Sequence, residues 1–208
     1  MKTKSQKHID SILAAIRSHG WTVEAFRNGL KKSGASEAEA KKLFPHGIED
    51  IVSLFHAMID DAMQARIREK RNFVALRVRD KITFAVRARL GAIEPYRDIM
   101  RRLLIWSLHP RNIRKATQQL WHAADMVWIA AGDTSTDYNY YTKRLLLIAV
   151  MKSTLSFWLH DVSAKYQETW AFLDRRIADV MMVGKGISVI KTVGISEIFS
   201  LVRNRLAG

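Results

Sequence analysis

The sequence predicts an all-α fold. Only three prolines and ten glycines interrupt its 208 residues. Apolar residues recur at the three- and four-residue spacing of amphipathic helices, and few segments alternate with the period of two that is typical of strands. Hydrophobic residues make up 48% of the chain and charged residues 26%, which favours a globular protein with its own core. The longest apolar run, residues 145–151, is far shorter than the roughly 20 residues that span a bilayer.

Residues 1–68 are predicted to form three short helices and one longer helix. Thr22 and Ser36 have side chains that cap helix N-termini, so the second and third helices should begin after them. Gly34 suits the end of the second helix, and Pro45 should stop the third. The apolar sides of the first helix and of the fourth, which begins near Ile48, are expected to comprise Ile9, Ile12, Leu13, Ile16, Ile51, Leu54, Phe55 and Met58.

This succession resembles the N-terminal layout of TetR-type regulators. We therefore expect residues 1–68 to be a helix-turn-helix-like region followed by a larger helical ligand-binding domain. The third helix begins with Glu37 and Glu39, whose carboxylates DNA phosphates would repel. A degenerate helix-turn-helix that does not bind nucleic acid is the preferred interpretation. The alternative is a TetR-type DNA-binding transcriptional regulator that responds to a hydrophobic ligand.

Residues 69–183 are predicted to form the larger helical domain. Its first helix should carry Ile82, Val86 and Leu90 at helical spacing. Pro95 and Pro110 suit the first turns of two further helices. Gly184 and Gly186 are expected to break the helical pattern before a last helix in residues 184–208. The other helices are expected at residues 110–131, 136–160 and 164–183.

The net charge of +14 indicates an anionic partner surface. Much of the excess lies in residues 66–115, which hold 15 Lys and Arg against 4 Asp and Glu. The chain has no cysteine, which excludes disulfides, thiolate catalysis and zinc–thiolate sites. We find no motif of paired histidines, no glycine-rich phosphate loop and no nucleophile elbow. We therefore expect no catalytic residue, no metal site and no cofactor.

Residues 130–144, AAGDTSTDYNYYTKR, join two predicted helices. Gly132 suits the left-handed position just past a helix end, and the segment from Thr134 has the spacing of a capping box. Four later residues, spaced i, i+3, i+4 and i+7, share one face of the second helix. Tyr and Arg are enriched at the energetic centres of protein interfaces, so this face is predicted to bind a protein partner. The partner-binding residues are Asp137, Tyr140, Tyr141 and Arg144.

The segment 125–147, DMVWIAAGDTSTDYNYYTKRLLL, closely resembles the signature of the ubiquinone-biosynthesis accessory family known as Coq-nine. The resemblance continues at LFPHG (43–47), FWLHDVS (157–163) and FLDRRI (172–177), so it covers most of the chain. One departure is Tyr140, where many members of the family have Trp.

The resemblance implies a TetR-like helical fold that has lost DNA binding and usually forms dimers, so we expect a homodimer. Because we find no catalytic constellation, we expect that the protein is not an enzyme. It implies a lipid pocket in residues 69–183 for an isoprenoid ubiquinone precursor. It also implies presentation of that lipid to the demethoxyubiquinone hydroxylase, a separate di-iron enzyme, through a patch that includes Tyr140 and Tyr141. The apolar candidates for the lipid pocket are Trp121, Met126, Leu147, Met151, Leu155, Trp158 and Phe172.

Residues 184–208 are predicted to form an amphipathic membrane-binding helix. Five apolar side chains would share one face and two arginines would flank it, which suits the surface of an anionic bilayer. These residues are Ile195, Ile198, Phe199, Val202, Arg203, Arg205 and Leu206. The sequence shows no targeting segment at its start. We therefore expect a bacterial cytoplasmic protein that is peripheral on the inner membrane, or a matrix-side protein of the mitochondrial inner membrane if a eukaryotic precursor was trimmed.

Overall fold

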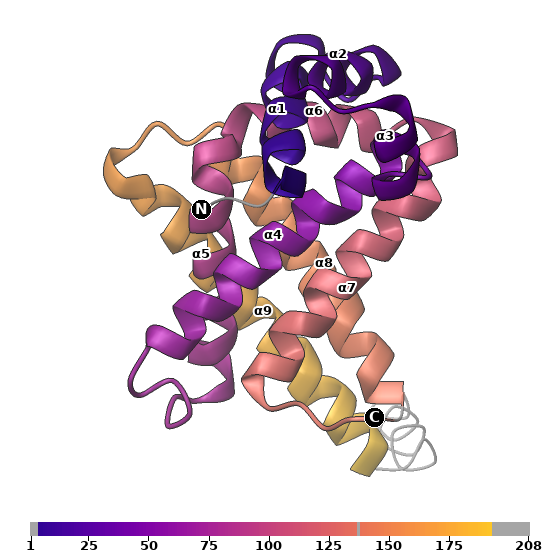
Figure 1. Ribbon diagram of the computed structural model, residues 1–208. Helices are drawn as coiled ribbons and strands as arrows, with labels where there is room; N and C mark the ends of the chain where they lie inside the picture. The colour runs from indigo at the N-terminus through magenta and orange to yellow at the C-terminus, as the bar shows by residue number, and fades with distance from the viewer. Residues whose placement is uncertain (1–3, 137, 193–208) are drawn as a thin grey trace, which may run out of the picture.

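The computed structural model describes residues 4–136 and 138–192, and this part of the chain contains helices and no strand. The predicted all-α class is therefore confirmed. A small N-terminal group of helices lies against one end of a larger helical bundle (Figure 1). Among the described residues, no helix combines the length and the apolarity that crossing a bilayer requires.

The N-terminal group consists of α1 (Lys4–His19), α2 (Val23–Ser33) and α3 (Glu37–Leu43). Both predicted caps are confirmed: the Thr22 side chain accepts a hydrogen bond from the Ala25 N–H, and that of Ser36 accepts one from the Glu39 N–H. Gly29 lets α1 and α2 cross closely, because a Cβ at this position would lie 2.4 Å from the Ile12 Cα.

The long helix α4 (Ile48–Glu69) connects the N-terminal group to the bundle (Figure 1). Ile51 and Phe55 are fully buried, as predicted. The Trp21 ring packs against Phe55 at 5.7 Å between centroids, and its indole N–H donates to the Ile99 carbonyl at 3.1 Å. These contacts tie the N-terminal helices to the bundle through one aromatic side chain.

The bundle continues with α5 (Val78–Ile93), α6 (Arg97–Ser107), α7 (Ile113–Ala131), α8 (Tyr138–Trp158) and α9 (Gln167–Thr192). Pro95 and Pro110 lie in short 3₁₀ turns, Glu94–Tyr96 and Pro110–Asn112, directly before α6 and α7. The buried side chains form a hydrophobic core that extends from Ile9 in α1 to Ile177 in α9. The helix α8 packs between α7 and α9. The turn between α7 and α8, which belongs to the predicted partner-binding segment 130–144, lies at the end of the bundle opposite α1–α3 (Figure 1).

The predicted helix break at Gly184 and Gly186 is wrong, because α9 continues through both residues to Thr192. Glycine in a helix interior costs only about 1 kcal/mol relative to alanine, which does not by itself end a helix. The start of α9 also differs from the prediction. Ala164–Tyr166 form a 3₁₀ turn in which Lys165 and Tyr166 have positive φ, and the α-helix begins at Gln167. The predicted membrane-binding residues, Ile195 to Leu206, lie outside the described residues.

Candidate docking site on α7 and α8

The turn between α7 and α8 begins at Gly132, as predicted. This residue has φ of 87°, and its N–H donates to the carbonyls of Ile129 and Trp128. The Asp133 N–H also donates to the Trp128 carbonyl, at 3.0 Å. Because these bonds satisfy the last carbonyls of α7, the chain reverses within a few residues and Asp133 faces the first turns of α8.

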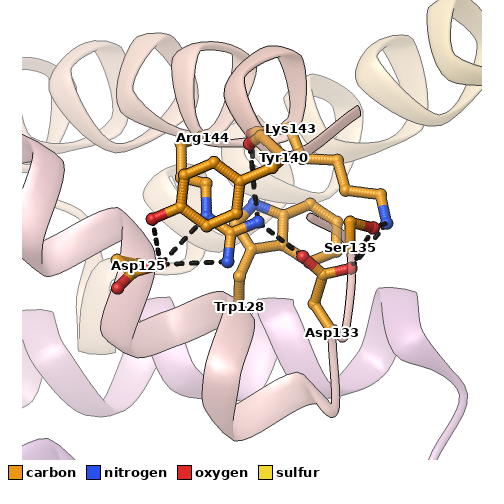
Figure 2. Close-up of polar contacts among 7 residues, drawn as sticks. All are labelled: Asp125, Trp128, Asp133, Ser135, Tyr140, Lys143 and Arg144. Carbon is orange, nitrogen blue, oxygen red and sulfur yellow. Dashed lines mark hydrogen bonds and ion pairs between the residues drawn. The ribbon is translucent and has the colours of Figure 1, made fainter. Parts of the chain in front are cut away.

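Arg144 lies at the centre of an ionic network that joins the two helices (Figure 2). Its side chain is only 2% exposed. Its Nε and one terminal nitrogen contact Asp125 Oδ1 at 3.0 and 2.9 Å, and the other terminal nitrogen donates to Asp133 Oδ2 at 2.5 Å. One guanidinium therefore pairs with a carboxylate of α7 and with a carboxylate of the turn.

Lys143 completes the pairing of Asp133. Its Nζ contacts Asp133 Oδ1 at 2.6 Å and donates to Ser135 Oγ at 2.6 Å. Burial alone would raise the pKa of Asp133, but hydrogen bonds from Lys143, Arg144 and Ser135 lower it from 3.8 to about 2. Burial disfavours the charge of Arg144, whereas hydrogen bonds to Asp133 and Asp125 raise its pKa above the ordinary value. Both partners of the pair are therefore charged at neutral pH.

Trp128 fixes the second contact between α7 and α8. Its indole N–H donates to the Lys143 carbonyl at 3.0 Å, and the Lys143 Nζ lies 5.4 Å from the centre of its ring (Figure 2). The side chain itself is buried. The register between the two helices is thus set by an indole hydrogen bond and by the ionic network together.

Three aromatic rings gather above this network. Tyr140 lies 6.2 Å from Trp121 and 5.2 Å from Tyr141, and Trp121 lies 6.0 Å from Tyr141, between ring centroids. The Arg144 guanidinium carbon lies 3.8 Å from the Tyr140 ring centre, and the Tyr140 hydroxyl donates to Asp125 Oδ1 at 3.3 Å. Tyr141 is 57% exposed. We call Trp121, Tyr140 and Tyr141 the aromatic cluster.

The site consists of a fixed ionic network beneath three aromatic rings. Cationic donors bind both oxygens of Asp133, and a carboxyl with a pKa of about 2 is a poor proton acceptor at neutral pH. The described residues contain no group of His, Asp and Glu side chains arranged to hold a metal ion. An exposed tyrosine beside a partly buried tyrosine and tryptophan has the composition of a protein-interface centre.

The structure separates Arg144 from the two tyrosines among the predicted partner-binding residues that it describes. Tyr140 and Tyr141 lie together in the aromatic cluster, whereas Arg144 is buried beneath Tyr140 and contacts Asp125 and Asp133. Arg144 therefore positions the ring above it. Asp137 lies outside the described residues. Sequence reasoning missed Asp125 and Lys143, although both belong to the matched segment, because neither has the helical spacing that selected the others.

The structure places the predicted lipid-binding residues in several different surroundings. Trp121 belongs to the aromatic cluster, whereas Leu147, Met151 and Trp158 are buried in the hydrophobic core. Met126 and Leu155 are partly buried and pack against that core. Phe172 lines a cavity beside the end of α8.

That cavity lies between the end of α8 and the beginning of α9 and has a volume of about 460 Å³. Phe157 and Phe172 stack on one side of it, at 4.8 Å between centroids and 9° between ring planes. An apolar wall with polar groups around it is typical of a small-molecule site. The lining residues are Ser153, Ser156, Phe157, His160, Asp161, Val162, Glu168 and Phe172.

Arg97 and Asp161 order the loop at the edge of this cavity. Asp161 is buried and accepts hydrogen bonds from the N–H of Ser163 and from the N–H and hydroxyl of Thr169. Burial raises the pKa of Asp161, but these hydrogen bonds outweigh it and hold the pKa well below its usual range. Arg97 donates to the carbonyls of Trp158 and Asp161 at 2.7 and 3.1 Å. Arg97 therefore holds the backbone of the loop between α8 and α9, and the Asp161 carboxylate ties the loop to the first turn of α9.

Known proteins resemble this chain over most of its length. A model of the COQ9 family matches residues 113–184. The "Ubiquinone biosynthesis protein COQ9, mitochondrial" of Rattus norvegicus is 32% identical over 192 residues, which cover 89% of this chain and 61% of the relative. The protein of the same name from Homo sapiens is 31% identical, over 89% of this chain and 60% of the relative. The chain thus spans about 60% of the length of these relatives.

A solved structure resembles the fold. The TetR transcriptional regulator from Nitrosomonas europaea ATCC 19718 superposes with a TM-score of 0.67 and 18% sequence identity, over 85% of this chain and 97% of the regulator. The predicted TetR-like fold is therefore confirmed. The family match includes Trp121, Tyr140 and Tyr141, and the relatives match most of the chain. From these matches, the chain resembles proteins of the COQ9 family over most of its length.

Proposed function

We propose that this protein is a non-catalytic, lipid-binding protein of ubiquinone biosynthesis. It extracts an isoprenoid quinone precursor from the membrane and presents it to the demethoxyubiquinone hydroxylase. Its COQ9 relatives, which are named as mitochondrial ubiquinone biosynthesis proteins, support the pathway. In this proposal the protein needs no cofactor of its own, because it delivers a substrate and the hydroxylase performs the reaction.

The observation that carries the docking step is the pre-ordered aromatic cluster. Tyr140 is held by the guanidinium of Arg144 and by its hydrogen bond to Asp125, so its side chain is already ordered before a partner binds. Ordering a flexible side chain at an interface costs about 0.5–1.5 kcal/mol. Tyr141, which is 57% exposed beside it, offers apolar area and a hydroxyl to the hydroxylase.

The lipid-binding step is supported by the cavity beside Phe157 and Phe172. Its volume of about 460 Å³ lies within the usual range for small-molecule sites, about 300–1,000 Å³. It suits the ring of a quinone precursor and the first part of its tail. Each buried methylene of that tail would contribute about 0.8 kcal/mol, so a longer apolar path between the helices would bind more of the tail.

The membrane step rests on charge and on the sequence near the C-terminus. A net charge of +14 favours an anionic bilayer, and the amphipathic pattern from Ile195 to Leu206 is typical of a helix at a membrane surface. We therefore place the protein at the periphery of an inner membrane, where it works as a homodimer. No role in binding nucleic acid is included, because α3 presents Glu37 and Glu39 at its beginning.

The docking step is tested by changing both Tyr140 and Tyr141 to alanine and measuring the affinity for purified hydroxylase. We expect a loss of about 2 kcal/mol or more, about thirtyfold in Kd. The control is Val23→Ala, because Val23 is an exposed apolar residue on α2 and should leave the affinity unchanged. Equal affinity of the double variant and the wild type would refute the docking step. Mass spectrometry of lipids that copurify with the wild type tests the binding step, and recovery of no isoprenoid lipid would refute it.

A further inference from the structure

The loop between α4 and α5, residues 70–77, presents an apolar side chain on a rigid base. Phe73 is buried and packs against Phe84, with ring centroids 5.7 Å apart. The Phe73 N–H donates to the Lys70 carbonyl at 3.0 Å, and the Leu76 N–H donates to the Phe73 carbonyl at 3.1 Å. These two consecutive turns fix the backbone on both sides of Val74.

Val74 itself is 86% exposed, although the neighbouring Phe73 side chain is buried. Val78, at the beginning of α5, is also exposed. An aliphatic side chain that an ordered turn holds in water contributes no burial free energy to the protein's own core. It would gain free energy by entering an apolar layer.

Cationic residues surround this exposed tip. Seven Lys and Arg lie between residues 66 and 81, against the two acids Glu69 and Asp80. Some of the cations are engaged by the protein: Arg79 donates to the Asp174 carbonyl, and the Lys70 Nζ lies over the Phe84 ring. Arg71 and Arg77, on either side of Val74, are exposed. The full set is Arg66, Arg68, Lys70, Arg71, Arg77, Arg79 and Lys81.

An anionic bilayer fits this combination better than a nucleic acid does. Lipid headgroups would neutralise the arginines, and the acyl layer beneath them would receive Val74. The phosphates of a nucleic acid would also pair with the arginines. A nucleic acid has no apolar layer, however, that could receive the side chain of Val74.

The position of the loop supports the same partner. In Figure 1 the loop lies at the end of the molecule where α9 also ends, and the turn between α7 and α8 lies at this end too. A second exposed apolar and basic surface, at the corner between α6 and α7, includes Leu108 and Ile113. That corner lies at the other end of the molecule, because α6 packs against α1.

We propose that the α4–α5 loop is a membrane-contacting element, in which Val74 enters the headgroup region of an anionic bilayer between Arg71 and Arg77. This inference deepens the proposed function and depends on its claim that the protein works at a membrane. With the loop on the bilayer, the end of the molecule that carries the α7–α8 turn faces the membrane, where a membrane-bound hydroxylase can reach the aromatic cluster.

The test measures sedimentation of the full chain with vesicles of phosphatidylcholine and cardiolipin. The loop variant carries Arg71→Gln, Val74→Ser and Arg77→Gln. The matched control carries Leu108→Ser, Arg111→Gln and Arg114→Gln, which alter charge equally and apolar character similarly at the α6–α7 corner. All six side chains are exposed, so both variants should keep the helical circular dichroism and the Tm of the wild type.

We expect the loop variant to bind these vesicles on the order of tenfold more weakly than the wild type, given the contribution of each surface cation. The control variant should bind as the wild type does. The inference is overturned if the loop variant retains wild-type binding, or if the control loses as much as the loop variant. Vesicles of phosphatidylcholine alone should bind the wild type weakly, and equal binding to both compositions would overturn the role of Arg71 and Arg77.

A truncation after Thr192 separates this inference from the proposed C-terminal membrane helix. If the truncated chain loses binding and the loop variant retains it, the inference fails and the proposed helix stands. If the loop variant loses binding and the truncated chain retains it, the inference stands and the proposed helix fails. If the wild type binds neither kind of vesicle, both fail.

Discussion

Arg144 and Asp133 form a buried ion pair across the turn between α7 and α8. Their nitrogen and oxygen atoms are 2.5 Å apart, and the side chains are 2% and 3% exposed. A charge this deeply buried is tolerated because its partners are fixed. Asp125 and Lys143 provide the second contact for each member of the pair. The pair therefore controls both the stability of the turn and the position of Tyr140 above it.

Asp133→Asn should destabilise the fold by about 3 kcal/mol, because breaking a buried pair leaves an incompletely compensated charge. Urea unfolding followed by circular dichroism measures this change. Asp179→Asn is the matched control, since it removes the exposed pair with Arg176 and should cost about 1 kcal/mol or less. Equal losses in the two variants would show that the Asp133 pair contributes no more than a surface pair.

Acid should remove the contribution of Asp133 in a defined range of pH. Its pKa is lowered from 3.8 to about 2 in the folded protein, so the unfolded chain takes up the proton first as the pH falls. The stabilisation is complete above about pH 5 and is lost progressively as the pH falls through 3.8 and then through about 2. It amounts to about 2 kcal/mol, at 1.36 kcal/mol per pKa unit.

The difference in unfolding free energy between the wild type and Asp133→Asn, followed from pH 6 to pH 2, isolates this effect. Asp161, whose pKa is also lowered, is present in both proteins and cancels. A difference that stays constant over this range would contradict the assignment of the shift to Asp133.

Local features of the fold were predictable from the sequence. Thr22, Ser36 and Gly132 act within a few residues of their own positions, and all three perform the predicted roles. The break expected at Gly184 failed because helix propensity is a weak preference that the rest of the helix overcomes. Local patterns are reliable where a side chain or a backbone angle acts on its immediate neighbours.

The site was only partly predictable, because its central contacts join different helices. The spacing of Tyr140 and Tyr141 indicated a shared face, and the structure brings their rings together with Trp121. The same spacing included Arg144 in that face. Asp125 lies in α7, 19 residues before Arg144, and accepts a hydrogen bond from its guanidinium. Helical periodicity within α8 could not indicate this contact.

Tyr140→Phe should separate the stability of the site from partner binding. The change removes the hydrogen bond from the hydroxyl to Asp125, so we expect a loss of about 1 kcal/mol in unfolding free energy. The ring remains over Arg144 and beside Trp121, so affinity for the hydroxylase should stay close to that of the wild type. Tyr140→Ala should lower both the unfolding free energy and the affinity for the hydroxylase. Binding measurements on the two variants decide the point, and if Phe weakens association as much as Ala, the hydroxyl itself must contact the partner.

Filling the cavity beside Phe157 and Phe172 should reduce lipid binding without unfolding the protein. Ser156 lines the cavity and is exposed, so Ser156→Trp places an indole in the space that a ligand would occupy while leaving the core intact. We expect several-fold less lipid to copurify, measured by mass spectrometry per mole of protein.

Ala149→Trp is the control for this experiment. Ala149 is an exposed residue of the same helix and is not among the residues that line the cavity. It introduces the same side chain outside the cavity and should leave the lipid content unchanged. If Ser156→Trp copurifies with as much lipid as Ala149→Trp, the lipid binds elsewhere. The apolar surfaces of Leu147, Met151 and Trp158, which are buried in the core, would then have to open for the tail to enter between the helices.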